Sequence, residues 1–269
     1  MPKAFVNGIN IYYQVHGSGE PLVLIQGFSG DHTGWFFQTP AFKKHFQVVV
    51  FDNRGIGRTD PSPAPYTIRT MADDTVGLMD FLGIDKARIL GMSLGGMVAQ
   101  EVAIDYPDRV KRLALICTMA SQDGVSRVSP KLLEAFGIRD GATQPDLGSV
   151  DFLKTATTMT ALAFNKRLYR MILVPLTQRY VKRVGIAGYL GQTEAVSGHS
   201  TRDRLHLIRV PTLVMTGTED RIISPSSSDE IARLITHAKL VKVEGGSHAF
   251  FIEMRGRFNR EVLDFLRAG

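Results

Sequence analysis

Hydrophobic and polar positions follow two different rhythms along this chain, and the changes of rhythm mark its elements. Short, continuous apolar runs are typical of strands buried on both faces, and they occur at residues 22–25, 48–51, 88–90 and 113–117. Between them, apolar residues recur at helical spacing, over residues 71–82 and 97–106. Residues 1–13 alternate as a strand does. Strands that alternate with helices predict an α/β fold, with a mostly parallel sheet flanked by helices.

The rhythm breaks after residue 120 and resumes near residue 209. Residues 121–208 carry Met, Phe and Leu at helical spacing, whereas strand-like runs return at 212–215 and 239–243, before an amphipathic helix at 257–266. We therefore expect one core, formed by residues 1–120 and 209–269, with a helical cap inserted at 121–208. Six apolar cap residues are expected to cover a substrate pocket: Met159, Leu162, Phe164, Leu168, Met171 and Leu173.

Composition and charge narrow the classes of function. The chain has 269 residues, of which 44% are hydrophobic and 22% charged, and this ordinary globular composition is enough for a sizeable core. Most of the formal net charge of +6 falls within residues 121–208, without a run of like charges or a basic helix interleaved with aromatic residues. A solvated basic surface is therefore favoured over nucleic-acid binding, and a mild preference for anionic substrates is the alternative.

The cysteine content and the apolar runs bear on location. Cys117 is the single cysteine, so it cannot form an intramolecular disulfide, and its apolar neighbours predict a buried strand thiol. No apolar run approaches the ~20 residues of a membrane span, and the N-terminal residues do not have the pattern of a signal peptide. We expect a cytoplasmic protein without a membrane span.

A serine stands where a predicted strand turns directly into a predicted helix. Gly91 and Gly95 flank Ser93 at two residues on either side, after the strand at 88–90. This G-x-S-x-G spacing is typical of a sharp strand-to-helix turn, where side chains two positions away would collide with neighbouring backbone. We predict that Ser93 is a nucleophile held above the sheet.

A serine hydroxyl needs a base before it can attack a carbonyl, and the base needs a carboxylate to orient it. In this architecture the chain order is serine, acid, histidine. Asp220 follows the strand at 212–215 and a glycine turn, so we predict it as the acid, with Glu219 and Asp123 as alternatives. His248 lies between the last apolar strand and the terminal helix, on a loop at the same sheet edge, and is the predicted base.

The negative charge that develops on the attacked carbonyl needs two backbone donors. The Leu94 amide, at a helix N-terminus, is one candidate. The Phe28 amide is the other, because Gly27 lets the backbone turn after the strand at 22–25. Core or cap packing is favoured for Trp35, Phe36 and Phe37, but Trp35 and Phe28 are the best candidates for an apolar pocket wall. The predicted substrate-binding residues are Trp35, Phe28 and Phe250.

Together these residues resemble the α/β-hydrolase superfamily, and the likeness extends over nearly the whole chain apart from the cap. Residues 51–60 resemble the D-x-R-G-x-G-x-S motif of the carboxylesterase, enol-lactonase and cofactor-free haloperoxidase branch, with Thr59 in place of the usual serine. The resemblance implies that Asp52 and Arg54 support the fold. It also shows a departure, since the family usually has histidine where this chain has Gln26.

The resemblance and the site residues predict a serine hydrolase that cleaves a small or medium ester or lactone through an acyl-enzyme. A hydrolase of C–C bonds in β-diketones or ring-fission products, or a cofactor-free perhydrolase or haloperoxidase, would use the same three residues. The C–C alternative is disfavoured because Ala249 follows His248 where such enzymes typically carry an aromatic residue. A ligand receptor without turnover is the least favoured reading. No metal or organic cofactor is expected, because the corresponding motifs do not occur in the required context.

Overall fold

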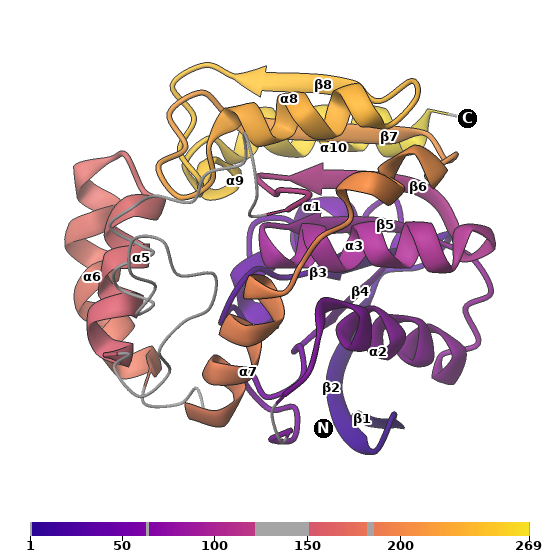
Figure 1. The fold of residues 1–269 in the computed structure, drawn as a ribbon, viewed down its shortest axis with the longest axis horizontal. Coiled ribbons are helices and arrows are strands. Elements are labelled where there is room, and N and C mark those ends of the chain that lie inside the picture. The colour runs from indigo at the N-terminus through magenta and orange to yellow at the C-terminus, as the bar shows by residue number, and fades with distance from the viewer. Residues whose placement is uncertain (1, 63–64, 122–150, 182–185, 269) are drawn as a thin grey trace.

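The computed structural model describes residues 2–62, 65–121, 151–181 and 186–268. Figure 1 shows a central sheet with helices on both faces. The strands are β1 (Lys3–Val6), β2 (Ile9–His16), β3 (Pro21–Ile25), β4 (Gln47–Phe51), β5 (Ala87–Met92), β6 (Val110–Ile116), β7 (Thr212–Gly217) and β8 (Lys239–Val243). The α-helices are α1 (Thr39–Phe42), α2 (Ile68–Phe81), α3 (Leu94–Asp105), α5 (Phe152–Ala163), α6 (Arg167–Val181), α7 (Ile186–Ser197), α8 (Pro225–Leu234), α9 (Phe250–Glu253) and α10 (Arg255–Arg267). Short 3₁₀ turns are η1 (His32–Trp35), η2 (Pro107–Arg109) and η4 (Arg202–Leu207).

The central strands are buried on both faces, as their continuous apolar runs predict. In β3, Leu22 and Leu24 enter one core, whereas Val23 and Ile25 enter the other. The first core, with Val23, packs against α2, α3 and α8, and the second packs against α1, α9 and α10 (Figure 1). This two-sided burial explains why these strands read as unbroken apolar runs.

The order of the strands determines where a ligand can bind. The sheet order is β1-β2-β4-β3-β5-β6-β7-β8, and the pairs from β4 to β8 are parallel. The chain passes from β3 to β4 on one side and then returns to place β5 on the other side of β3. Such a reversal leaves a crevice beyond the carboxyl ends of the two strands that flank it. The segments that leave β3 and β5 at this crevice begin with Gln26 and Ser93.

In the described part of the chain between β6 and β7, the α-helices are α5, α6 and α7, and we call them the inserted helices. In Figure 1, α5 and α6 stand at the side of the sheet toward which the arrowheads of β6 and β8 point. The ends of the insertion meet where Ser121 forms a bridge with Ser200. The turn η4, which falls inside the predicted cap range, packs against α3 and α8 and buries Leu205 in the core. Residues 122–150 and 182–185 of that range, with Asp123, lie outside the described residues.

The N-terminal segment differs from the single alternating strand expected over residues 1–13. Asn7 and Gly8 both have positive φ, of 46° and 80°, and they join β1 to β2 as an antiparallel hairpin. An Asn-Gly pair is the preferred sequence for such a two-residue turn. Buried positions change from even, at Ala4 and Val6, to odd, at Ile9 and Ile11, so the phase of the alternation also changes at this turn.

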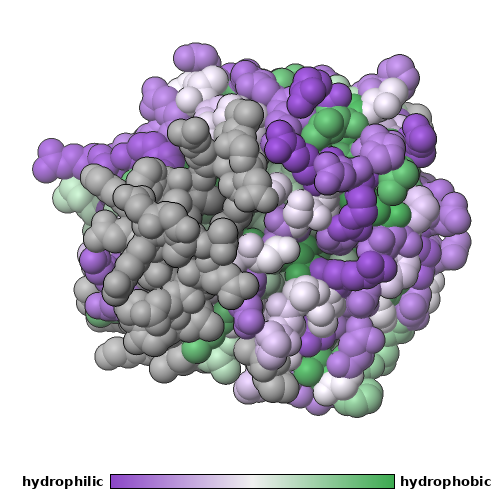
Figure 2. All heavy atoms as spheres, in the orientation of Figure 1, coloured by the Kyte–Doolittle hydropathy of each residue, from purple (hydrophilic) through white to green (hydrophobic). Residues whose placement is uncertain are grey.

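The surface of the described residues is mixed in character. On the face shown in Figure 2, hydrophobic residues lie in small groups among hydrophilic ones, as is ordinary for a surface in contact with water. Within the described part of the chain, no helix is both long and apolar enough to cross a membrane.

Candidate active site

Ser93 occupies a strained turn between β5 and α3. Its φ of 54° and ψ of −120° lie outside the regions that most residues adopt. The Ser93 amide donates to the carbonyl of Ile116 at 2.8 Å, and the Ser93 carbonyl accepts from the Thr118 hydroxyl at 2.8 Å. The Ser93 side chain does not cap α3, so its hydroxyl is not committed to the helix. The turn therefore presents the hydroxyl beside a helix N-terminus, where a developing negative charge is stabilised.

The two glycines of the motif are required by close backbone contacts. A Cβ at Gly91 would lie 2.1 Å from the carbonyl oxygen of Gly95, and a Cβ at Gly95 would lie 2.2 Å from the carbonyl oxygen of Ile25. We expect Gly95→Ala to lower the free energy of unfolding by about 3 kcal/mol, because strand and helix must separate to admit the methyl group.

Urea denaturation of Gly95→Ala and of a matched variant would measure this effect. Gly256, in the first turn of α10, has no atom within 4 Å of a Cβ built on it. Gly256→Ala should therefore raise stability by up to about 1 kcal/mol. Equal midpoints for Gly95→Ala and the wild type would show that the contact around Gly95 is not tight.

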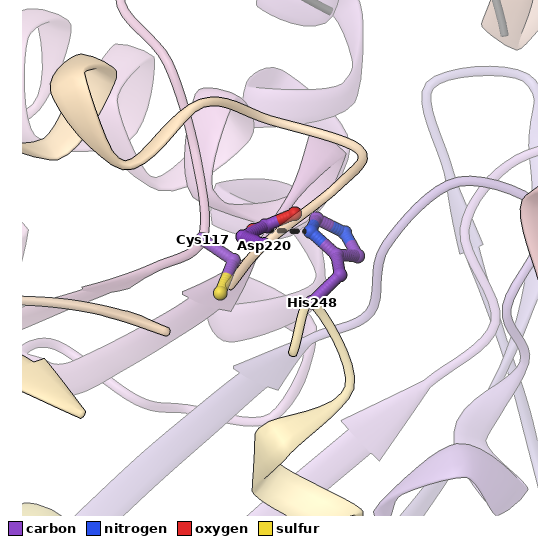
Figure 3. Close-up of side chains that lie close together, drawn as sticks. All are labelled: Cys117, Asp220 and His248. Atoms are coloured by element: carbon purple, nitrogen blue, oxygen red, sulfur yellow. Dashed lines mark hydrogen bonds and ion pairs between the residues drawn. The ribbon is translucent and has the colours of Figure 1, made fainter. Parts of the chain in front are cut away.

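Asp220 and His248 form a buried hydrogen-bonded pair. His248 Nδ1 lies 2.7 Å from Asp220 Oδ2, and Figure 3 shows the imidazole beside the carboxylate. The other carboxylate oxygen, Oδ1, accepts from the amides of Ile222 and Ile223 at 2.8 and 3.0 Å. Because a carboxylate only accepts, the pair fixes the proton on Nδ1 and leaves Nε2 able to take a proton. Glu219, the alternative acid, is exposed and bonds to Asn165.

Cys117 lies directly after β6 and completes a cluster with this pair (Figure 3). The possible metal-ligand atoms of Cys117, Asp220 and His248 all lie within 4.8 Å of one another. Burial, and then the charge of Asp220, raises the pKa of the Cys117 thiol well above its usual range. A metal ion would need the thiolate and the atoms that Asp220 and His248 already use for each other. The cluster therefore fits an acid–base pair beside a neutral thiol better than a metal site.

The segment after β3 lies directly against Ser93. A Cβ at Gly27 would be 3.2 Å from Ser93 Cβ and 3.1 Å from the sulfur of Met92, so Gly27 lets this loop approach the serine. The neighbouring amides have partners: Gly27 donates to Gln26 Oε1 at 2.8 Å, and Ser29 donates to Gln192 Oε1 at 2.7 Å. Phe28 therefore lies between two residues whose amides are held, and its role as a donor to the oxyanion stays a prediction.

Gln26, the departure from the family pattern, fills a slot made by two glycines. A Cβ at Gly30 would lie 2.4 Å from Gln26 Cγ, and a Cβ at Gly34 would lie 2.2 Å from Gln26 Nε2. The side chain is buried and its Oε1 holds the Gly27 amide. The Gln26 side chain, which stands where the family usually has histidine, thus holds the loop after β3 through the Gly27 amide.

We expect Gln26→Met to lower kcat for hydrolysis about tenfold, because it leaves the buried Gly27 amide without an acceptor and loosens the loop beside Ser93. Steady-state kinetics at a temperature where both proteins are folded would measure this. Gln14→Met is the matched control, since Gln14 on β2 bonds to the Tyr12 hydroxyl. A change in the control as large as that in Gln26→Met would indicate a general effect of losing a glutamine.

The inserted helix α7 contacts the same loop. Gln192 is fully buried on α7, and its bond to Ser29 holds a residue with a φ of 54°. The ring of Tyr189 stands edge-on to that of Phe28, with centroids 4.8 Å apart. Burial raises the pKa of the Tyr189 phenol, so it remains neutral. Sequence reasoning missed Gln192 and Tyr189, because nothing in the local pattern links α7 to a loop more than 150 residues earlier.

Ser93 and His248 open onto one cavity of about 380 Å³ between the core and the inserted helices. Asp31 and, when protonated, His248 are the charged side chains among the described residues that line it. The basic side chains of the described inserted residues therefore do not line this cavity. Most of the wall is apolar, and its large aliphatic, thioether and phenyl side chains are those of Phe28, Met92, Met159, Phe164, Leu173, Ile222, Phe251 and Ile252.

The structure corrects part of the expected pocket wall. Trp35 and Phe250 are fully buried in the core and are not among the described residues that line the cavity; Phe251, the neighbour of Phe250, takes that place. On α6, Leu168 and Met171 are 65% and 62% exposed, because they lie on the side of the helix opposite Leu173. Leu162 packs against the core. Phe28, Met159, Phe164 and Leu173 lie in the cavity wall as expected.

The motif at residues 51–60 makes fold-supporting contacts. Asp52 accepts from the backbone and ring of His32, at 2.7 and 2.6 Å, and from the Arg58 amide at 2.8 Å. Arg54 forms a buried two-point ion pair with Asp74, at 2.6 Å for each contact. Asp31, His32 and Asp52 have ligand-type atoms close together, but the Asp52 oxygens are occupied by these contacts. This group therefore fits a structural turn.

Comparison with known proteins agrees with this geometry. Residues 20–254 match the family described as alpha/beta hydrolase fold. A relative from Azorhizobium caulinodans named "Putative carbamate hydrolase RutD" is 29% identical over 98% of both chains. The solved enol-lactonase from Burkholderia xenovorans LB400 is 28% identical, covers 99% of this chain and 100% of its own, and superposes with a TM-score of 0.86. A solved hydrolase from Pseudomonas aeruginosa PA01 is also 28% identical, covering 99% of this chain and 98% of its own, with a TM-score of 0.85.

The match spans far more than half of the chain, and it includes the strands that carry Ser93, Asp220 and His248 to one sheet edge. The relatives are named as hydrolases, and this supports hydrolytic activity here. The predicted fold class is confirmed, and this chain belongs to the α/β hydrolase fold family.

Proposed function

We propose that this protein hydrolyses small or medium esters or lactones through an acyl-enzyme on Ser93. The observation that carries the proposal is the 2.7 Å contact between His248 Nδ1 and Asp220 Oδ2, at the edge of a cavity that Ser93 also lines. A nucleophile on a strained turn, a histidine able to accept a proton and a carboxylate that orients it form the constellation needed for acyl transfer.

In this mechanism His248 Nε2 takes the Ser93 hydroxyl proton as the oxygen attacks the substrate carbonyl carbon. The amides of Phe28 and Leu94 donate to the oxyanion of the tetrahedral intermediate. The intermediate collapses, and the leaving alkoxide takes the proton from His248 while the acyl group stays on Ser93. Water then repeats the attack with the same proton transfers and releases the acid. Asp220 holds the imidazole orientation and stabilises the imidazolium.

The size and lining of the cavity support an apolar substituent on the substrate. A volume of about 380 Å³ falls in the range of small-molecule sites, and the wall is largely apolar. Each methylene buried there should add about 0.8 kcal/mol to binding. We therefore expect a p-nitrophenyl butyrate kcat/KM up to about tenfold above that of the acetate, since two further methylenes are buried.

Carbamate esters are the second candidate, favoured by the relative of that name at 29% identity. Their carbonyl can be attacked by the same serine, and the polar residues Thr160 and Gln26 are among those that line the cavity. A C–C bond hydrolase or a perhydrolase would use the same three residues. The location proposed with this function is the cytoplasm.

A panel of substrates at equal concentration tests the proposal. It consists of p-nitrophenyl acetate, butyrate and octanoate, a γ-lactone, a phenyl carbamate and a vinylogous β-diketone. Faster turnover of an ester or lactone supports the proposal, and faster turnover of the carbamate or the diketone moves that class to first place. A folded protein that turns over none of them contradicts hydrolysis of this kind.

A further inference from the structure

Residues 161–166 form the end of α5 and the link to α6, and we call them the α5–α6 turn. They bond directly to both neighbours of Asp220 and to Ala249 after His248, and they reach Ser247 before His248 through Glu253. Asp220 follows β7 and His248 follows β8, on two separate loops. The hydrogen bond between Asp220 and His248 thus joins two segments that are both held by a third.

On the acid side, the side chain of Arg221 reaches the turn. Its Nη2 donates to the carbonyl of Phe164 at 2.8 Å and to that of Ala161 at 3.2 Å. On the other flank of Asp220, Glu219 Oε2 accepts from Asn165 Nδ2 at 2.8 Å. The backbone of Asp220 therefore lies between two anchored side chains.

On the histidine side, the contacts involve backbone and a buried carboxylate. The Ala249 amide donates to the carbonyl of Ala163 at 2.9 Å. Glu253 is buried, and its Oε2 accepts from the Ser247 hydroxyl at 2.5 Å and from the Asn165 amide at 3.3 Å.

The second oxygen of Glu253 continues this network. Oε1 accepts from the Lys166 amide at 2.7 Å, and Lys166 Nζ donates to the Glu253 carbonyl at 3.0 Å. A buried carboxylate with several donors holds its neighbours firmly, because each donor would otherwise lose a partner. Ser247, directly before His248, is thereby fixed to the start of α6.

We propose that the α5–α6 turn is a clamp that positions Asp220 and His248, with Arg221 and Glu253 as its positioning residues. The inference rests on the proposed function, since it gives the clamp the task of keeping the imidazole aligned with Ser93. A misplacement of about 1 Å in such a group can cost about a hundredfold in rate. The two loops also contact each other, since the Glu219 amide donates to the Gly246 carbonyl and the Gly245 amide to the Thr218 hydroxyl, each at 2.9 Å. The clamp adds a third segment that holds the residues next to Asp220 and His248.

The clamp is built mainly from backbone atoms and forms part of the cavity wall. Five of its contacts use backbone atoms of the turn, so the position of the turn matters more than its side chains. Ala163 and Phe164 also line the cavity. A substrate that contacts Ala163 and Phe164 therefore also contacts the segment that positions His248.

Labelling of Ser93 by a fluorophosphonate probe tests the clamp without knowledge of the natural substrate. Glu253→Met removes the carboxylate. Glu253→Gln keeps an oxygen for the Lys166 amide and an NH₂ group that can donate to the Ser247 oxygen, and it gives up only the longer 3.3 Å contact with the Asn165 amide. The double variant Arg221→Met with Asn165→Ala loosens the acid side from the surface. We expect Glu253→Met and the double variant to be labelled about tenfold more slowly, with kcat for an ester reduced similarly and KM changed less than threefold. Glu253→Gln should retain most of the wild-type rate.

Arg109→Met is the matched control, because Arg109 also donates to backbone carbonyls, those of Ile84 and Asp85, but before the first residues of β5 and β6, whereas the site lies beyond their carboxyl ends. It should be labelled at the wild-type rate. Wild-type labelling rates in both Glu253→Met and the double variant, at a temperature where they are folded, overturn the clamp alone. If Glu253→Met does not fold, the labelling rate of the double variant alone tests the clamp. Failure of the folded wild type to be labelled overturns the proposed function, and the clamp with it.

Discussion

Ser93→Ala should lower kcat for ester hydrolysis by about five to six orders of magnitude, because the variant has no atom to form the acyl-enzyme. The change removes one oxygen from a turn that backbone contacts hold in place, so the fold should remain. The Ser93 backbone keeps its bonds to Ile116 and Thr118. Active-site titration and steady-state turnover of p-nitrophenyl butyrate, with protein freed of contaminating esterase, would measure the loss.

Ser197→Ala is a suitable control for this experiment. Ser197 lies at the end of α7, and its hydroxyl donates to the carbonyl of Thr193 in the preceding turn. Its loss should leave turnover within about twofold of the wild type, as for most changes of small surface hydroxyls. An active Ser93→Ala protein would mean that another residue forms the acyl-enzyme, or that none is formed.

Asp220→Asn should lower kcat about 10⁴-fold by forcing the wrong tautomer on His248. The reason lies in the other carboxylate oxygen, which accepts from the amides of Ile222 and Ile223. Those two donors require an oxygen at that position, so the asparagine NH₂ must face His248 Nδ1. The imidazole then has to accept at Nδ1 and carry its proton on Nε2, where it cannot take the proton of Ser93.

Single-turnover kinetics of Asp220→Asn would measure this loss. Asp229→Asn is the control, because Asp229 pairs with Lys242 on the surface and its loss should change little. A loss of less than about tenfold in Asp220→Asn would indicate that Glu219 or another group orients the histidine.

Much of the fold could be predicted from the sequence because its signals are local. Unbroken apolar runs identify β3, β4, β5, β6 and β7, since each of these strands is buried on both faces. The glycines around Ser93 identify the turn between β5 and α3, since no other residue fits the contacts there. The hairpin between β1 and β2 was missed, because one alternating run over residues 1–13 was predicted although Asn7 and Gly8, a preferred hairpin pair, interrupt it.

The pocket wall could be predicted only in part, for a different reason. Phe250 and Phe251 are adjacent on the four-residue helix α9, and so short a helix carries no periodicity that decides which ring faces the cavity. Trp35 packs on Phe251 from behind, with ring centroids 5.6 Å apart. Contacts such as Arg221 with Phe164 span 57 residues and depend on tertiary packing. The roles of Ser93, Asp220 and His248 stay predictions until the variants are measured.

The buried thiol beside Asp220 gives this site a built-in reporter of local opening. Cys117 is the chain's single cysteine, and burial with a raised pKa makes the closed state unreactive toward thiol reagents. Modification therefore requires the ends of β6 and β7 to separate, and its rate under native conditions measures how often the surroundings of the acid come apart. The modification rate of Cys117 would thus measure how often the structure around Asp220 opens locally when no substrate is bound.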